Sequence, residues 1–280
     1  MNIIYISLYL LVCIFTRVSA KNIKYIIWDA GSTLTTIQQM GIAQEMGAKT
    51  IIKMLVRLGG SRKVRDYMME VFEQYAGKQQ TPETDDLLSN DSYGKPLPQF
   101  MSDTWLCSRI PNKELLHHIS RAIDQWRPQD DLSPEQKQLV KKIMQTALSA
   151  RILGKNTICP QGALTIVQKL AKKGYRQYIL SNFDKESFEI AYANERNQDL
   201  WGYIPREHVL ISGDCGMIKP HKCMFAYFLQ KYQLNPHECL LIDDQLENIE
   251  AARKYGIQTI HLKKQHYHRL GRKLKKRDIL

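Results

Sequence analysis

The chain has 280 residues, of which 44% are hydrophobic and 24% are charged. This composition provides enough apolar side chains for one large domain or two modest ones, and it excludes a chain that is disordered throughout. The formal net charge is +12, and the last twenty residues hold eight Lys or Arg and one Asp, so they carry +7 of that total.

The first twenty residues have the pattern of a secretory signal. Residues 3–15 (IIYISLYLLVCIF) are apolar but too few for a comfortable membrane span, and the small residues Val18-Ser19-Ala20 follow them. We predict a signal peptide over 1–20 and an exported protein, either secreted or periplasmic. No Lys or Arg precedes the apolar run, so an uncleaved anchor and a misassigned start are the alternatives.

The cysteines give no sign of a metal site. Removal of residues 1–20 would leave five of the six cysteines, an odd number that cannot pair completely. None of the five has CxxC spacing, which argues against a structural zinc site. Most of them are expected to pack as small apolar residues.

The first structured element is an apolar run at residues 25–28 (YIIW), which ends on Asp29 and opens into a polar turn that contains Gly31. This pattern predicts a buried strand that the turn stops. Residues 37–155 differ, because apolar side chains at helical spacing predict helices over 43–58, 64–75, 115–126 and 134–148. No strand is predicted there, so we expect a helical insertion after the first strand.

The second half of the chain alternates helices with apolar strands. Helices are predicted over 161–173, 222–232 and 245–255, and strands over 178–180, 208–212, 239–242 and 259–262. This alternation predicts an α/β fold with a doubly wound parallel sheet, built from 21–36 and 156–262. Residues 263–280 are expected to form a basic C-terminal tail.

Polar side chains follow three of the predicted strands, and a loop after the strand at 208–212 contributes one more. Because ligands bind at the carboxyl ends of parallel strands, we expect these side chains to meet at one edge of the sheet. They are Asp29, Ser181, Asn182, Lys219, Asp243 and Asp244.

These residue types suit a phosphate group and a hard cation. Mg²⁺ prefers carboxylate, carbonyl and water oxygens, and carboxylates packed together without a cation would repel one another. Asp29 is then a candidate nucleophile that attacks phosphorus and forms an aspartyl-phosphate. Ser181, Asn182 and Lys219 are donors for the phosphoryl oxygens, where stabilisation of the transferring group is mainly needed.

Four segments carry a resemblance to a known family: IIWDAGSTL, YILSNFD, SGDCGMIKP and LLIDDQLENIEAA, in this order. With them the chain resembles the haloacid dehalogenase superfamily, which consists mostly of Mg²⁺-dependent phosphatases. The resemblance covers about 20–36 and 157–262, and the helical region over 37–155 resembles the cap domain that the family inserts after its first motif.

The resemblance implies a role for each residue at the strand ends. Asp29 would be the nucleophile, Ser181 and Asn182 would bind the phosphoryl group, and Lys219 would stabilise both Asp29 and the phosphate. Asn248 would lie in the outer shell of a magnesium ion. The implied ligands of that ion are Asp29, the main-chain carbonyl of Gly31, Asp243 and Asp244.

Gly31 departs from the pattern of most phosphatases in the superfamily. They have a second Asp at this position, a general acid that protonates the leaving oxygen, and such catalysis contributes roughly 10²–10⁴-fold. Phosphatases that resemble the sugar-1-phosphate branch also have Asp-x-Gly here. Since sugar-1-phosphates have a better leaving group than alkyl phosphates, we predict a hydrolase of small phosphomonoesters, with sugar phosphates as the suggested class.

Two other functions are weighed against this prediction. A true 2-haloacid dehalogenase resembles the first motif, but those enzymes look metal-free, whereas the pair Asp243-Asp244 favours a cation. A catalytically weak or inactive binding protein is the other alternative, because a strand-end Asp such as Asp29 often serves only as a turn residue. Loss of turnover in Asp29→Asn would separate an enzyme from a binding protein.

The basic tail has several possible partners. A solvated tail without a specific partner is the simplest interpretation, and contact with anionic surfaces is the alternative. Nucleic-acid binding is not expected, because no recognised reader module accompanies the tail. The oligomeric state cannot be predicted from the sequence.

Overall fold

The computed structural model describes residues 22–76, 101–128 and 132–280. The predicted signal peptide over 1–20 lies outside these residues. In the described parts of the chain, no helix is long and apolar enough to cross a membrane. No disulfide joins the cysteines that the structure describes.

A parallel sheet of five strands forms the centre of the α/β part, in the order β5-β4-β1-β6-β7. The first strand of the chain, β1, therefore lies in the middle, between β4 and β6. The predicted parallel α/β fold is confirmed. The strands are β1 (Tyr25–Trp28), β4 (Arg176–Ser181), β5 (Val209–Ile211), β6 (Cys239–Asp243) and β7 (Gln258–His261).

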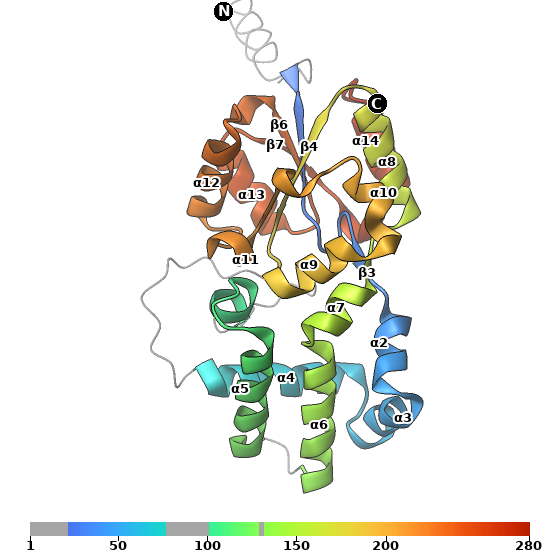
Figure 1. Ribbon diagram of the computed structural model, residues 1–280, viewed down its shortest axis with the longest axis vertical. Coiled ribbons are helices and arrows are strands. Elements are labelled where there is room, and N and C mark those ends of the chain that lie inside the picture. The colour runs from blue at the N-terminus through green and yellow to red at the C-terminus, as the bar shows by residue number, and fades with distance from the viewer. Residues whose placement is uncertain (1–21, 77–100, 129–131) are drawn as a thin grey trace, which may run out of the picture.

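Helices cover both faces of this sheet (Figure 1). Side chains of a strand alternate between its two faces, so Ile26 and Trp28 pack into one apolar cluster with α8 and α14, while Ile27 packs into the other with α12 and α13. The sheet is therefore doubly wound. The helices of this part are α8 (Gln161–Lys172), α9 (Lys185–Ala193), α10 (Gln198–Trp201), α11 (Ser212–Cys215), α12 (Lys222–Tyr232), α13 (Leu246–Lys254) and α14 (Tyr267–Lys275).

Helices also build the region between β1 and α8, which has an apolar core of its own around Leu115, Ile119 and Met144. A two-stranded antiparallel pair, β2 (Thr36–Ile37) with β3 (Thr157–Ile158), lies where the chain enters and leaves this region. The helices are α2 (Gln39–Met46), α3 (Ala48–Arg57), α4 (Ser61–Ala76), α5 (Asn112–Gln125), α6 (Pro134–Ala147) and α7 (Ala150–Asn156), with a π-helix at Met101–Leu106.

The predicted helix over 43–58 is two helices. Gly47 has φ +81°, a left-handed conformation that glycine adopts without strain, and it separates α2 from α3. The apolar spacing of residues 43–58 continues across Gly47, so periodicity alone did not reveal the break between the two helices. The pair β2 and β3 was also missed, because two residues are too few to show the alternation of a strand.

The prediction of a solvated basic tail is wrong for residues 267–280. Leu270, Leu274 and Ile279 are 0% exposed and belong to the same apolar cluster as the central strand. The hydroxyl of Tyr267 donates a hydrogen bond of 2.9 Å to the main-chain oxygen of Thr33, in the turn after β1. Apolar residues at helical spacing inside a basic segment produce an amphipathic helix that is part of the core.

Candidate active site

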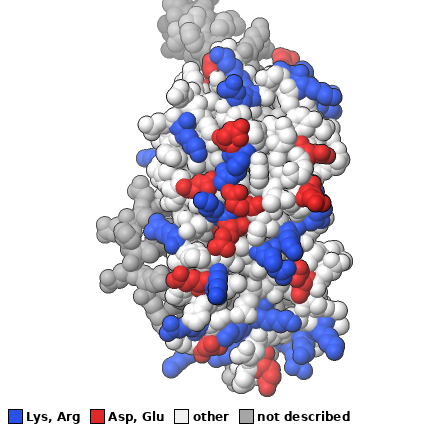
Figure 2. Space-filling view, in the orientation of Figure 1, with Lys and Arg blue, Asp and Glu red and all other residues white. Residues whose placement is uncertain are grey.

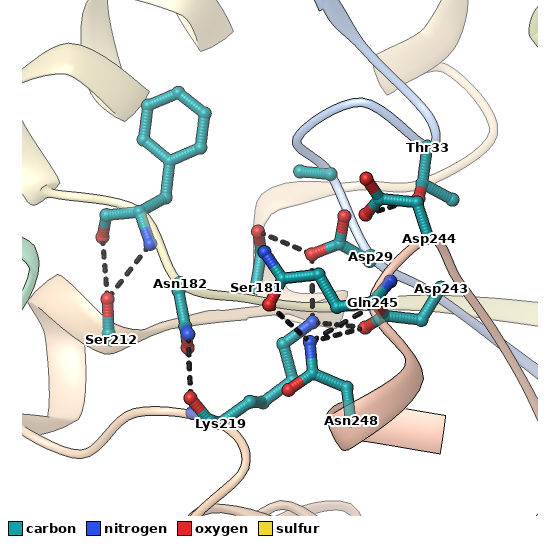
Figure 3. Close-up of polar contacts among 12 residues, drawn as sticks. Asp29, Thr33, Ser181, Asn182, Ser212, Lys219, Asp243, Asp244, Gln245 and Asn248 are labelled. Carbon is teal, nitrogen blue, oxygen red and sulfur yellow. Dashed lines mark hydrogen bonds and ion pairs between the residues drawn. The ribbon is translucent and has the colours of Figure 1, made fainter. Parts of the chain in front are cut away.

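Four segments bring polar side chains together at the carboxyl edge of the sheet (Figure 3). Trp28 of β1 pairs with Ile179 of β4 on one side and with Ile242 of β6 on the other. Asp29, which follows Trp28, therefore stands between the ends of β4 and β6, where Ser181 and Asp243 are the last residues. Lys219 reaches the same place from the loop after α11.

Lys219 is the centre of the site. Its side chain is fully buried, and Nζ lies 2.8 Å from Oδ1 of Asp29 and 2.7 Å from Oδ2 of Asp243. Burial lowers the pKa of Lys219, but the carboxylates of Asp243 and Asp29 outweigh it and hold that pKa above its usual range. Lys219 is therefore a fixed positive charge that holds two carboxylates from different strands.

Asp29 has one oxygen engaged and one available. Oδ1 accepts hydrogen bonds from Lys219 and, at 3.1 Å, from the hydroxyl of Ser181. No described residue donates to Oδ2. Burial raises the pKa of Asp29 to about 6, opposed by Lys219 and supported by the charge of Asp243. An ionised Asp29 is thus held in one orientation with a lone oxygen, as a nucleophile requires.

Asp243 is surrounded by donors from the protein. Besides Lys219, the main-chain N–H of Gln245 donates to Oδ1 at 2.8 Å, and the amide of Asn248 lies 3.1 Å from both carboxylate oxygens. The sequence predicted Asp243 as a metal ligand. These contacts instead favour a positioning role for Asp243, which holds Lys219 and the turn that leads into α13 in place.

Asp244 has few hydrogen-bond partners. Among the described residues only the hydroxyl of Thr33 donates a hydrogen bond to its carboxylate, at 3.4 Å. Burial, together with the nearby charges of Asp29 and Asp243, raises the pKa of Asp244 to about 7. Its main-chain oxygen is 2.8 Å from Nε2 of His261, which holds the end of β6 to β7.

The donor set fits a divalent cation with oxygen ligands. Carboxylate oxygens of Asp29, Asp243 and Asp244 all lie within 4.8 Å of one another. One lysine offsets three carboxylates, so a cation would remove the remaining repulsion. Oδ1 of Asn248 is buried with no hydrogen-bond partner in the described structure, and such an acceptor suits a water of a hydrated cation.

The side chain of Asn182 does not lie where the sequence suggested. Its Nδ2 donates to the main-chain oxygen of Lys219 at 2.8 Å, and its Oδ1 accepts from the main-chain N–H of Lys219 at 2.7 Å. Both ends of the amide thus hold the backbone of Lys219. Asn182 is a positioning residue for that lysine, and its predicted contact with a phosphoryl group through the side chain has no support in this arrangement.

Two neighbouring positions complete the site. A Cβ built at Gly31 meets no atom within 4 Å, so packing does not require glycine there. The role of its carbonyl as a metal ligand stays a prediction.

Ser212, which the sequence did not suggest, accepts a hydrogen bond from the main-chain N–H of Phe183 and donates one of 2.6 Å to the main-chain oxygen of Leu106. These two bonds join the helical region to the loop after β4.

Comparisons with known proteins agree with this architecture. A family model described as a haloacid dehalogenase-like hydrolase matches residues 23–256. Among curated proteins, a drimenol cyclase of Aspergillus calidoustus is 27% identical over 97 residues, which is 35% of this chain and 17% of that protein. The chain thus spans about a sixth of the length of that relative.

Solved structures with a similar fold include proteins of two bacteria. A haloacid dehalogenase family enzyme of Bacteroides thetaiotaomicron has 16% identity and a TM-score of 0.54, covering 89% of this chain and 98% of that one. Its magnesium complex has 17% identity and a TM-score of 0.53, covering 90% and 99%. A predicted hydrolase of Porphyromonas gingivalis has 16% identity and a TM-score of 0.50, covering 91% and 98%.

Proposed function

Because the chain belongs to the haloacid dehalogenase-like hydrolases, we propose that it hydrolyses small phosphomonoesters through a covalent phosphoryl group on Asp29. One observation carries the proposal: three carboxylates lie within reach of one cation, next to a buried lysine and a strand-end serine. Asp29 and Asp244 have oxygens to which no described residue donates a strong hydrogen bond, and these two carboxylates would hold the ion, while Asp243 adds negative charge beside it.

The chain's own residues can perform both halves of the reaction. The free oxygen of Asp29 attacks phosphorus, the bond from phosphorus to the ester oxygen breaks, and the leaving alcohol takes a proton from water. A second water then attacks phosphorus, releasing inorganic phosphate and the Asp29 carboxylate. Ser181 and Lys219 donate to the oxygens whose charge increases in the transition state. When bound, Mg²⁺ supplies further positive charge to the phosphoryl oxygens.

The missing acid at Gly31 points to the kind of ester. Without a side chain there, the leaving oxygen departs with little protonation, which suits esters of acidic alcohols such as sugar-1-phosphates. Dehalogenation is the less favoured function. It involves no phosphate, and it gives no reason for Asp244 to lie beside Asp29 in a site whose burial already raises both carboxyl pKa values.

The test compares leaving groups in wild type, Gly31→Asp and Gly31→Asn. We expect wild type with Mg²⁺ to release phosphate faster from an aryl phosphate and a sugar-1-phosphate than from an alkyl phosphate. Because space is open at Gly31, Gly31→Asp should raise the alkyl phosphate rate about 100-fold, within the range of acid catalysis. Gly31→Asn has a similar size but no acid, and it should not.

Metal removal belongs to the same assay. A chelator should stop phosphate release by wild type, and added Mg²⁺ should restore it. No release from any ester in the presence of Mg²⁺ would contradict the proposed function. A wild type that cleaves alkyl and aryl phosphates equally well would contradict the leaving-group argument alone.

A further inference from the structure

Two segments of the chain carry +9 of its net charge of +12. Residues 161–176 and 267–280 together contain ten Lys or Arg and one Asp. The other 250 residues contain 30 basic and 27 acidic residues, so they are close to neutral. A positive charge of this size in 30 residues forms a local field that attracts anionic partners.

The fold places these two segments side by side. Helices α8 and α14 are in contact, and the position of Gly162 against the ring of Tyr267 shows that both helices begin at the same end. Their apolar sides are buried in one cluster, so the basic side chains face outward. We call this surface the α8–α14 face. Its exposed basic residues are Lys169, Lys172, Lys173, Arg176, Arg269, Arg272, Lys273, Lys275 and Lys276.

Figure 2 shows blue Lys and Arg side chains along the upper right, where Figure 1 places α8 and α14. Among the described residues, no ion pair includes any member of the face. Close by, Arg253 and Arg277 both hydrogen-bond to Thr259, through its hydroxyl and its main-chain oxygen. Burial and Arg253 lower the pKa of Arg277, as expected for neighbouring cations without an acid.

The face continues to the point where the chain enters the described structure. A groove of about 420 Å³ is lined by Lys173 and Arg176 of this surface, by Lys24, which pairs with Glu238 at 2.6 Å, and by Ile23 and Tyr25. Lys24 immediately precedes β1 and Arg176 begins β4, so the groove lies at the amino ends of the strands. The candidate active site lies at the carboxyl ends, and a partner bound here would leave it accessible.

We propose that the α8–α14 face binds the surface of an anionic phospholipid bilayer. A row of lysines and arginines on two packed helices matches a flat layer of phosphate headgroups.

Nucleic acid is the less favoured partner. Single-stranded binding sites use exposed aromatic rings on which bases stack. The aromatic residues beside this face, Tyr175 and Tyr267, instead pack against the apolar core. The face thus offers charge without the stacking surfaces that binding of a single strand would use, and competition with a DNA duplex tests the remaining form of nucleic acid.

The test measures co-sedimentation of the full chain with vesicles of neutral phosphatidylcholine and with vesicles that also contain phosphatidylglycerol. We expect stronger binding to the anionic vesicles, weakened by salt. Exchange of Lys169, Lys172, Arg272 and Lys276 for Gln should reduce that binding about 600-fold, because each of the four basic residues near the surface contributes about fivefold. All four side chains are exposed, so their exchange should leave the thermal midpoint unchanged.

A matched control changes the same residue types in the helical region, where Lys49, Lys53, Arg57 and Lys113 are also exposed. Their exchange for Gln should leave vesicle binding unchanged. Equal binding to neutral and anionic vesicles would overturn the proposal, and so would equal losses of binding in the two variants. It would also be overturned if a short DNA duplex bound the protein more tightly than the anionic vesicles do, and so displaced it from them. None of them depends on phosphatase activity, so this proposal and the proposed function fail separately.

Discussion

Asp29→Asn is expected to lose at least about 10⁴-fold in phosphate release, because it removes the nucleophile while preserving the size of the side chain. Oδ1 of Asp29 is held by Lys219 and Ser181 in the folded protein. An asparagine can keep an oxygen in that place, so the fold should persist. Steady-state rates with Mg²⁺ and a reactive aryl phosphate provide the measurement.

The control for this variant is Asp199→Asn, which makes the same chemical change at an exposed position of α10. It should retain the activity of wild type. Equal turnover by Asp29→Asn and wild type would remove Asp29 from the reaction. That result would favour the alternative weighed from the sequence, a catalytically weak or inactive binding protein.

Lys219→Met is expected to reduce the free energy of unfolding by about 3–5 kcal/mol in metal-free buffer at neutral pH, because it leaves buried carboxylates without their cation. Lys219 is fully buried between Asp29 and Asp243. Removing one of the two carboxylates as well, in the double variant Lys219→Met/Asp243→Asn, should recover a large part of the loss. Urea denaturation of the single and double variants measures this coupling.

Lys222→Met is the matched control, since Lys222 is exposed at the start of α12. Its effect should stay within about 0.5 kcal/mol, as for most surface substitutions. A Lys219→Met protein as stable as wild type would show that the buried carboxylates of Asp29 and Asp243 are not stabilised by the positive charge of Lys219. The electrostatic description of the site would then be wrong.

The sequence indicated the fold and the main residues of the site for a simple physical reason. Strands with apolar runs and helices with apolar stripes predict a parallel sheet, and all strands of such a sheet end at one edge. Asp29, Ser181 and Asp243 therefore had to meet, whatever the details of the loops. The structure brings them together, with Lys219 between two of them.

Other features depend on contacts that no local pattern encodes. The amide of Asn182 could serve a ligand or a backbone, and only the path of the loop at Lys219 decides that it binds the backbone. The donors around Asp243 come from a turn and from Asn248, one helical turn further on. The tail was misjudged for another reason: its charge outweighed the apolar stripe of Leu270 and Leu274, which the core buries.

The fit of a cation connects these observations. Asp29 and Asp244 have oxygens to which no described residue donates a strong hydrogen bond, whereas both oxygens of Asp243 accept hydrogen bonds. Three carboxylates therefore serve two purposes, one holding the lysine and two facing the space where an ion and a phosphate would meet. This division could not be read from the adjacent pair Asp243-Asp244 in the sequence.

Acid quenching during turnover, followed by proteolysis and mass spectrometry, tests the covalent role of Asp29 most directly. Wild type mixed with Mg²⁺ and an excess of a reactive phosphate ester should yield a peptide containing Asp29 that is heavier by one phosphoryl group, and Asp29→Asn should not. Active turnover with that peptide unmodified at every quench time, or with the phosphoryl group on another residue, would contradict the mechanism.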